Sequence, residues 1–205
     1  MLLFQVIVMS ELHEATNAVD EVFRLFRDYG EDDYIGESVS KTTHSIQCGM
    51  LAERDGYPNE VIVGAFLHDI GHLVGADKGM AIMVTDGVNF GAKNHDVIGA
   101  EFLKNLSFPD TVCDIVRGHV NAKRYLVFKN SHYSQKLSSA SKLTLQHQGG
   151  PMTAEEASEF EKSHLFDTIL RMRSWDESGK ELDTVLDPIE KFKTLCLDIL
   201  TGNSK

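Results

Sequence analysis

Cysteine is scarce in this sequence. Only Cys48, Cys113 and Cys196 occur among 205 residues; they lie far apart, and none belongs to a Cys-x-x-Cys pair. This excludes a disulfide framework and a cysteine-rich zinc site, so we expect three reduced, buried thiols. Low-complexity linkers and internal repeats are also absent. We therefore expect a single domain over residues 1–205.

Long apolar runs and an excess of positive charge are missing too. The apolar N-terminus "MLLFQVIVM" covers nine residues and has no basic segment before it, which argues against a signal peptide or a membrane span. The formal charge of −11 argues against nucleic acid or an anionic membrane as the partner. We expect a cytoplasmic protein that acts on a small molecule, with local cations if that molecule is anionic.

Helical periodicity is present almost throughout, and we found no useful run of alternating apolar and polar residues. The sequence therefore predicts an all-α bundle. Asn59, Asn94 and the pair Thr153 and Glu156 are the expected N-terminal caps. The predicted helices cover residues 11–29, 37–54, 59–71, about 95–106, one from about 109, 134–147, 153–173, and one from about 187. Residues 73–94 hold four glycines without a clear period, and a long irregular segment of this kind is often functional.

The stretch "AFLHDIGH" places ionisable groups where an apolar helix should bury leucine and isoleucine. On a helix, His68 and His72 lie one turn apart, and Asp69 is close to both. Burying an unpaired carboxylate costs several kcal/mol, which a metal cation removes. Imidazole and carboxylate together suit iron, manganese, zinc or nickel. Taken alone, the pair is equally typical of a histidine and an acid at a helix end.

Further polar residues interrupt other helical faces. His44 and His119 lie on apolar faces, His95 follows a predicted cap, and Asp176 comes just after a long predicted helix. Four inward histidines and two acids on five separate helices are hard to explain as core residues. The sequence therefore predicts a metal centre.

A histidine on one helix, "HD" on the next and an aspartate on a late helix resemble the HD-domain superfamily, which implies an HD-domain helical bundle. The two further histidines resemble its branch that binds two metals. The resemblance implies that one metal takes His44, His68 and Asp176, that the second takes His95 and His119, and that Asp69 bridges them. Most proteins of this superfamily are phosphohydrolases, so a dinuclear phosphohydrolase is an alternative, and a metal-binding sensor without turnover is another.

Five other stretches are more specific: "DYIGESVSKTTHS", "GHVNAKRYL", "SASKLT", "QHQGGPM" and "RMRSWDESGK". Together with "AFLHDIGH" they resemble the HD-domain mixed-valent di-iron oxygenases that cleave carbon–phosphorus bonds, over about residues 33–180. The resemblance implies two iron ions, Fe(II) and Fe(III), with dioxygen as co-substrate and a hydroxyphosphonate as substrate. It places five residues around the phosphonate: His72, Lys123, Ser141, Thr144 and Arg173. It also implies that Tyr34 approaches the second iron without substrate and that Glu37 faces the nitrogen end.

The residues themselves agree with a phosphonate pocket. Lys123 follows His119 by four residues, so it projects beside the second metal. A dianion needs cations and hydroxyl donors, which Lys123, Arg173, Ser141 and Thr144 supply. The structural alternatives are a solvated helix face for these four residues, a helix-start aromatic for Tyr34, and an acid favoured by the helix dipole for Glu37.

The nitrogen substituent is predicted from the segment between His72 and His95. Its Met80, Met83, Asp86 and Phe90 suit a quaternary ammonium, which has no hydrogen-bond donors. This favours the N-trimethylated substrate, with glycine betaine and phosphate as products. The alternative is the primary amine, which would give glycine and phosphate. Other polar residues are predicted to lie on the surface: His13, His132, His147, His164, Lys41, Lys78 and Lys129.

Overall fold

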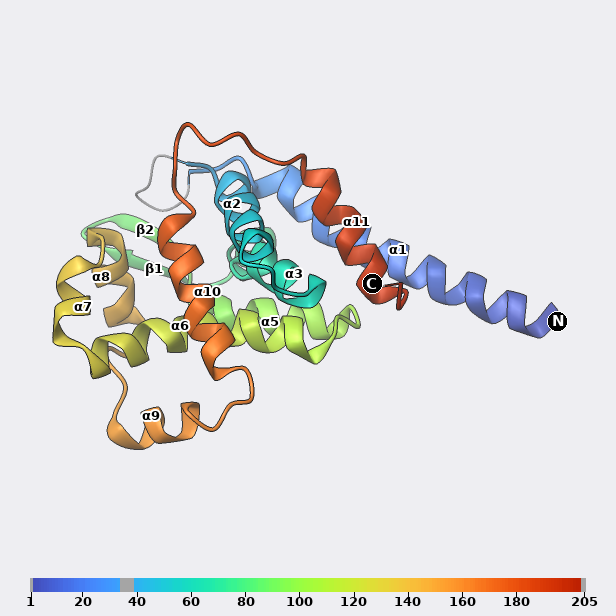
Figure 1. Cartoon of the computed structure of the whole chain (residues 1–205). Coiled ribbons are helices and arrows are strands. Elements are labelled where there is room, and N and C mark those ends of the chain that lie inside the picture. Colours follow the sequence, from blue (N-terminus) through green and yellow to red (C-terminus); the bar gives the residue numbers. More distant parts are fainter. Residues whose placement is uncertain (1, 34–38, 204–205) are drawn as a thin grey trace.

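The structure of the protein is a computed structural model that describes residues 2–33 and 39–203 (Figure 1). Within these residues the fold is mostly α-helical, as predicted, and its one sheet is a two-stranded hairpin. The helices are α1 (Leu2–Tyr29), α2 (Lys41–Arg54), α3 (Asn59–Leu67), α4 (Ile70–Asp77), α5 (His95–Asn105), α6 (Asp110–Lys129), α7 (Ser131–Lys136), α8 (Ser139–His147), α9 (Ala154–Phe160), α10 (Phe166–Ser178) and α11 (Ile189–Leu200). The strands are β1 (Ile82–Thr85) and β2 (Val88–Ala92).

Helix α3 lies at the centre of the bundle, and all its residues from Val61 to Leu67 are buried. The ring of Phe66 stacks on Phe26 of α1 and Phe192 of α11, with ring centroids 4.9 and 4.5 Å apart. Helices α2, α6 and α10 pack around α3 (Figure 1). Apolar burial of this extent is the main stabilising contribution to such a bundle, so α3 and its neighbours form a rigid base for the polar residues that follow. The three cysteines are free and buried, which confirms that expectation.

The predicted helix over residues 59–71 is in fact two helices. Helix α3 ends at Leu67, and α4 begins at Ile70. Between them, Asp69 departs from helical geometry with φ −100° and ψ 10°. Helical periodicity does not reveal this break, because apolar residues continue on both sides of it. The break turns Asp69 and His68 toward the same space.

Of the three predicted caps, one is wrong, one has the predicted position without the capping hydrogen bond, and one is confirmed. Asn59 is the first residue of α3, and Pro58 occupies the cap position. Asn94 is the N-cap residue of α5, as predicted, but it has a left-handed conformation, with φ 57°, and its side chain makes no capping hydrogen bond. The capping box of Thr153 and Glu156 is present at the start of α9, where each side chain bonds to the other's backbone N–H.

Four predicted helices also have different bounds. The helix expected over 11–29 already begins at Leu2. The helix expected over 37–54 begins at Lys41, where Ser40 accepts a hydrogen bond from the Thr43 N–H. The helix expected over 134–147 is divided into α7 and α8, because Ser138 caps α8 through the Ser141 N–H. The helix expected over 153–173 is divided into α9 and α10. Asp176 therefore lies in the last turn of α10 rather than beyond a helix.

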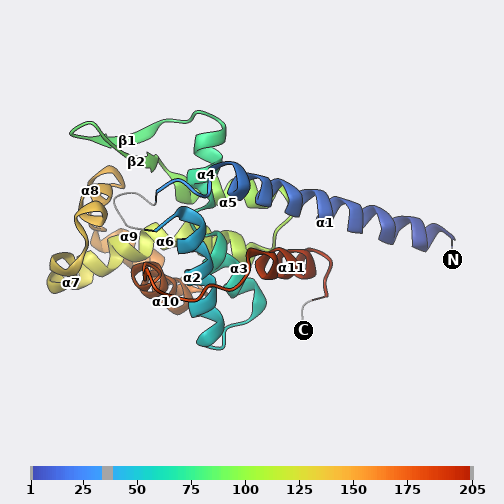
Figure 2. The ribbon, with the colours of Figure 1, turned by 90° about the horizontal axis from the view of Figure 1, so that it is seen from above.

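The irregular segment over residues 73–94 contains the hairpin of β1 and β2. Its turn is Asp86–Gly87, and both residues have positive φ, 52° and 78°. An Asp-Gly pair is a strong signal for the type I′ turn that joins two antiparallel strands. Thr85 pairs with Val88 at the turn, and Ile82 pairs with Ala92 at the open end. The hairpin extends along one side of α8 (Figure 2).

Helix α1 continues well beyond the body of the bundle toward the N-terminus (Figures 1 and 2). Its inner half packs against α4 and α11, and Val19, Val22 and Phe26 are buried there. Across the described part of the chain, no helix combines the length and the apolar character that crossing a membrane requires.

Candidate metal centre and active site

The interior of the bundle holds a group of buried ionisable side chains contributed by separate elements. His44 comes from α2, His95 from the start of α5, His119 from α6 and Asp176 from α10, while His68 and Asp69 form the break between α3 and α4. Each side chain is at least nine-tenths buried: His44, His68, Asp69, His95, His119 and Asp176. The structure therefore brings together all six residues that the sequence suggested as ligands.

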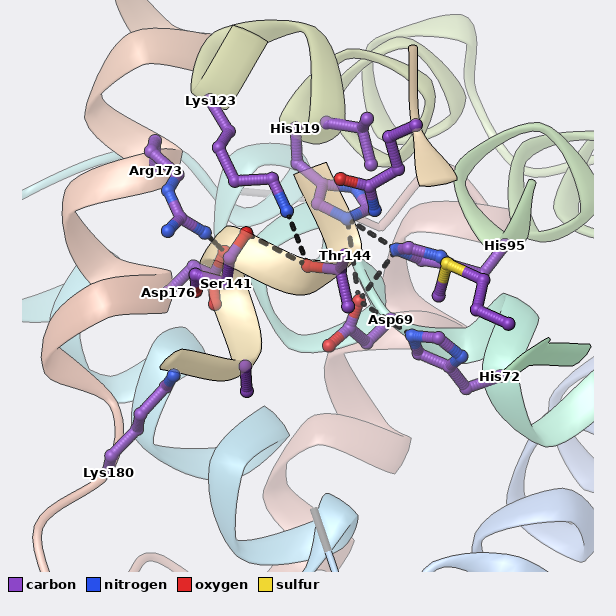
Figure 3. A pocket seen from close by; sticks show the side chains of 14 residues that line it. Asp69, His72, His95, His119, Lys123, Ser141, Thr144, Arg173, Asp176 and Lys180 are labelled. Carbon is purple, nitrogen blue, oxygen red and sulfur yellow. Dashed lines mark hydrogen bonds and ion pairs between the residues drawn. The ribbon is translucent and has the colours of Figure 1, made fainter. Parts of the chain in front are cut away.

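These residues form two clusters that share Asp69. In the first, His44 Nε2 lies 3.3 Å from His68 Nε2 and 3.4 Å from Asp176 Oδ1. Asp69 Oδ2 lies 3.4 Å from His68 Nε2. In the second, Nε2 atoms of His95 and His119 are 3.0 Å apart, and each is 3.4 Å from Asp69 Oδ1 (Figure 3). One carboxylate thus faces both histidine pairs, with one oxygen directed to each.

Hydrogen bonds on the far side of three rings fix which nitrogen faces inward. The Nδ1 atoms of His44, His68 and His119 lie 2.8, 2.9 and 2.7 Å from the backbone carbonyl oxygens of Gly179, Ala65 and Val116. A carbonyl only accepts, so each Nδ1 carries a proton, and each ring directs its Nε2 inward. Such outer hydrogen bonds are typical of metal-binding histidines.

Converging lone pairs repel one another unless a cation lies between them. Within the described residues, Asp69 Oδ2 is buried and accepts no hydrogen bond, and His95 Nδ1 is also buried without one. Imidazole nitrogens with carboxylate oxygens are a donor set that first-row transition metals favour. The residues therefore fit a pair of metal ions, with His44, His68 and Asp176 able to hold one, His95 and His119 the other, and Asp69 both.

The electrostatics of the site also favour positive charge. Burial alone lowers the pKa of His68, but the neighbouring carboxylates of Asp69 and Asp176 raise it to about 9. Burial alone raises the pKa of Asp69, but the neighbouring imidazoles of His68 and His119 hold it well below its usual range. The carboxylates thus stay ionised, and a metal ion would displace the proton from His68.

His72 differs from the other histidines. Its Nδ1 accepts a hydrogen bond of 3.0 Å from the backbone N–H of Ala92 in β2. Burial lowers the pKa of His72 to about 4, so the ring is neutral and its proton lies on Nε2. That Nε2 is 4.0 Å from Asp69 Oδ1, and the ring stacks on His95 with centroids 3.9 Å apart. His72 therefore presents an N–H donor to the cavity rather than a lone pair.

Cations and hydroxyls line the cavity beside the second cluster. Lys123 is buried, and its Nζ donates a hydrogen bond of 3.0 Å to Thr144 Oγ1. Ser141 lies one turn before Thr144 on α8 (Figure 3). Burial lowers the pKa of the Lys123 amine to about 7, and the positive charge of Arg173 adds to this effect. The wall of the cavity is formed by Asp69, His72, Met83, His95, His119, Val120, Lys123, Ala140, Ser141, Thr144, Gln148, Arg173, Asp176 and Lys180.

Arg173 lines the cavity but is held mainly by protein groups. It donates hydrogen bonds to the carboxylate of Asp176, to Tyr133 Oη at 2.9 Å and to Glu177 Oε1 at 3.1 Å. Burial opposes its charge, yet Asp176 and Tyr133 keep the pKa of Arg173 above its usual value. Arg173 therefore orients the carboxylate of Asp176 while it adds positive charge to the cavity.

The remaining residues singled out in the sequence differ in whether they reach the cavity or lie on the surface. Tyr34 and Glu37 lie outside the described residues. Met83 lines the cavity, while Phe90 is buried outside its wall, and Met80 and Asp86 are exposed. Of the four side chains on which the N-trimethyl interpretation rested, the segment between His72 and His95 therefore brings only Met83 to the cavity wall. Five residues predicted to be on the surface are exposed: His13, His132, His164, Lys78 and Lys129. Two are half-buried instead: His147, whose ring lies 2.8 Å from Thr85 Oγ1, and Lys41.

Sequence reasoning missed three neighbours of the site. Lys180 and Gln148 line the cavity, although the sequence around each was already part of a recognised motif. Cys48 lies one turn after His44 on α2, and its Sγ is 3.8 Å from His44 Nε2. The spacing of four residues from His44 was a usable signal for Cys48, whereas nothing local distinguishes Gln148 from other polar helix residues.

Comparison with known proteins places this geometry in a family. The HD domain family matches residues 42–185. A [1-hydroxy-2-(trimethylamino)ethyl]phosphonate dioxygenase (glycine-betaine-forming) of Leisingera caerulea is 42% identical over 167 residues, which cover 82% of each chain. A hydroxymethylphosphonate dioxygenase of Gimesia maris is 33% identical over 178 residues, 86% of this chain and 85% of the relative. An uncharacterized protein of Acanthamoeba polyphaga mimivirus is 35% identical over 195 residues, 95% of this chain and 87% of the relative. The chain therefore belongs to the HD-domain family and, within it, to the group of phosphonate dioxygenases.

Proposed function

We propose that this enzyme holds two iron ions in a mixed-valent Fe(II)/Fe(III) pair and uses dioxygen to cleave the carbon–phosphorus bond of [1-hydroxy-2-(trimethylamino)ethyl]phosphonate. The observation that carries the proposal is the position of Asp69 between two histidine pairs, beside a wall of cations and hydroxyls. The relative at 42% identity acts on this substrate by its name and supports the choice of the N-trimethyl group.

Oxidation is required because carbon is a poor leaving group in hydrolysis. The overall reaction adds one dioxygen to the substrate and yields glycine betaine and dihydrogen phosphate, which balances atoms and charge. When bound, the irons would supply Lewis acidity and a redox centre through which electrons pass from the substrate to dioxygen. The protein supplies ligands, orientation and a site that largely excludes water.

The roles of the residues follow from their contacts. Lys123 and the hydroxyls of Ser141 and Thr144 would bind the phosphonate oxygens, because charge-assisted hydrogen bonds are the strongest contacts that such a dianion makes. His72 would donate from Nε2, since the Ala92 N–H fixes the proton on that nitrogen. Arg173 would hold Asp176 in its ligand position and strengthen the positive field around the phosphonate.

Aerobic and anaerobic incubation with the N-trimethylated and primary-amine hydroxyphosphonates tests the proposal directly. The iron-loaded enzyme should release phosphate and glycine betaine in equal amounts, consume one dioxygen per turnover and show a mixed-valent paramagnetic signal. Phosphate release that persists without dioxygen would indicate hydrolysis and overturn the oxygenase. Glycine formed from the primary amine, without glycine betaine from the other substrate, would replace the substrate proposed here.

Removing the Lys123 amine should weaken substrate binding without loss of metal. Its Nζ donates to Thr144 Oγ1, which belongs to neither histidine cluster, so Lys123→Ala should leave iron content unchanged. We expect KM to rise by about ten- to a hundredfold, the range of a charge-assisted hydrogen bond. Lys142→Ala is the matched control, because Lys142 is exposed on the same helix as Thr144 and its Nζ bonds to the Gln135 carbonyl. An unchanged KM in Lys123→Ala would assign Lys123 no part in binding.

The pH dependence of the reaction should report on the same amine. Because burial lowers the pKa of Lys123 to about 7, the amine is charged below that pH and neutral above it. An anion binds the charged form better, so kcat/KM should fall as pH rises through about 7. Steady-state kinetics at fixed ionic strength would measure this decline. In Lys123→Arg the guanidinium stays charged, and the decline should disappear; the same decline in that variant would show that another group titrates.

A further inference from the structure

A buried amide oxygen in the wall of the cavity has no partner in the described protein. Gln148 lines the same cavity as Lys123 and Thr144, and its Oε1 accepts no hydrogen bond from any described residue. A buried acceptor left unpaired costs about 1–3 kcal/mol. In a cavity wall, that cost is recovered when a bound molecule donates a hydrogen bond.

Helix α8 directs a row of polar side chains along the cavity. Ser141, Thr144 and Gln148 are spaced by three and four residues and so share one face of the helix. Figure 3 shows Ser141 beside Arg173 and Asp176, and Thr144 closer to Asp69. Gln148 lies one turn beyond Thr144, so the row of polar side chains continues past Thr144 in the cavity wall.

The backbone at Gln148 is held in place on both sides. Its N–H bonds to the Thr144 carbonyl at 3.0 Å, and the next two residues, Gly149 and Gly150, form a left-handed turn with φ 94° and 74°. The Gly150 carbonyl accepts a hydrogen bond of 3.0 Å from Arg124, which also pairs with Glu156. A side chain on such a fixed turn is preorganised for a ligand.

The chemistry of the proposed substrate identifies the donor. A phosphonate dianion and a quaternary ammonium carry no N–H or O–H, so the 1-hydroxyl is the only hydrogen-bond donor of the molecule. The groups suited to the phosphonate, Lys123, Ser141 and Thr144, line the same cavity, and Ser141 and Thr144 precede Gln148 along α8. The neighbouring carbon and its hydroxyl would then lie within reach of the next turn of α8.

We propose that Gln148 accepts a hydrogen bond from the 1-hydroxyl of the substrate and thereby selects 1-hydroxyphosphonates over phosphonates that lack this group. The inference rests on the proposed function, because it takes the hydroxyphosphonate as the bound molecule. A site built to pair with a hydroxyl discriminates strongly against an analogue without one, since a buried acceptor then stays unpaired.

Anaerobic binding measurements test the proposal by comparing two ligands on several proteins. The ligands are [1-hydroxy-2-(trimethylamino)ethyl]phosphonate and its 1-deoxy analogue, titrated calorimetrically into iron-loaded enzyme. Gln148→Met keeps the length of the side chain and removes the acceptor. It should weaken the hydroxylated ligand by about three- to tenfold and leave the deoxy ligand within about twofold. Gln146→Met is the matched control, because Gln146 is exposed on the same helix, and its affinities should equal those of wild type.

A second variant covers the case in which methionine disturbs folding. Gln148→Glu keeps an acceptor, so it should weaken both ligands equally through repulsion of the phosphonate and preserve their affinity ratio. Iron content and melting temperature are recorded for every variant. The inference about Gln148 would be overturned if Gln148→Met weakened both ligands equally, or if Gln148→Glu lost the ratio between the two affinities. Neither result would contradict the proposed function. A wild-type enzyme that does not bind the hydroxylated ligand would overturn the proposed function as well.

Discussion

Asp69→Ala should lose both iron ions, because the two oxygens of this one carboxylate face different histidine pairs. Oδ2 lies 3.4 Å from His68 Nε2, and Oδ1 lies 3.4 Å from Nε2 of His95 and of His119. Removing a residue that only orients a metal ligand already lowers metal affinity about 10–100-fold. Removing a ligand that both metals share should lower it more. We expect iron to fall from about two ions per chain to a small fraction of one, and turnover to fall by about a thousandfold or more.

Metal analysis and dioxygen-dependent phosphate release would measure these losses, with circular dichroism to show that the fold persists. Asp96→Ala is the matched control, because Asp96 follows His95 directly but does not line the cavity. It makes the same change of charge and should keep wild-type iron. Asp69→Asn keeps the shape of the side chain and removes its charge, so its iron content should lie between those of Asp69→Ala and Asp96→Ala. An Asp69→Ala protein that still holds two irons per chain would disprove the ligand assignment.

The helical fold and the convergence of the ligands could be predicted because both depend on local spacing. An apolar stripe every three or four residues marks the buried face of a helix, and a histidine within that stripe must point inward. His44 and His119 were found in this way, and both are buried beside the other ligands. Six polar side chains on buried faces would be costly to bury separately, which is why their convergence could be inferred without a structure.

The breaks between helices could not be predicted in the same way. Apolar residues continue across the break at Asp69, and neither proline nor a glycine in a left-handed conformation marks it. The hairpin was missed for a different reason. Its strands have four and five residues, too short to show a clear alternation, although the Asp86–Gly87 pair at its turn was a readable signal.

The lining of the cavity depended on tertiary packing and was predicted least well. Met80, Met83 and Phe90 belong to one short segment, but only Met83 reaches the cavity, because neighbouring strand residues face opposite sides or lie beyond the pairing. Lys180 reaches it from just beyond α10, which ends at Ser178 rather than near the predicted Arg173, whereas Gln148 follows α8, whose end at His147 was predicted. The position of a helix end decides which way its last side chains point, so errors at the ends become errors in the site.

Gly71→Ala should disrupt the second metal cluster through the backbone, although Gly71 carries no functional group. A Cβ at this position would lie 1.9 Å from the carbonyl oxygen of His95 and 2.9 Å from the backbone nitrogen of Gly99. Both contacts are with the backbone of α5, so no side-chain rotation can relieve them. Helices α4 and α5 would have to move apart, and this would shift His95 and the neighbouring His72. We expect a loss of about 3 kcal/mol or more in the free energy of unfolding, at the upper end for overpacking.

Chemical denaturation and metal analysis of the same protein would separate this effect from a general loss of stability. Gly64→Ala is the matched control, since Gly64 lies in the adjacent helix α3 and its added Cβ would first meet a side chain, that of Ile115 at 2.9 Å, rather than backbone. That side chain can shift, so the control should lose about 1 kcal/mol and keep its iron. Gly71→Ala should bind iron mainly at the first cluster, because His44, His68 and Asp176 do not lie on α5. Equal stability and equal iron in the two variants would show that the close approach of α4 to α5 does not position His95.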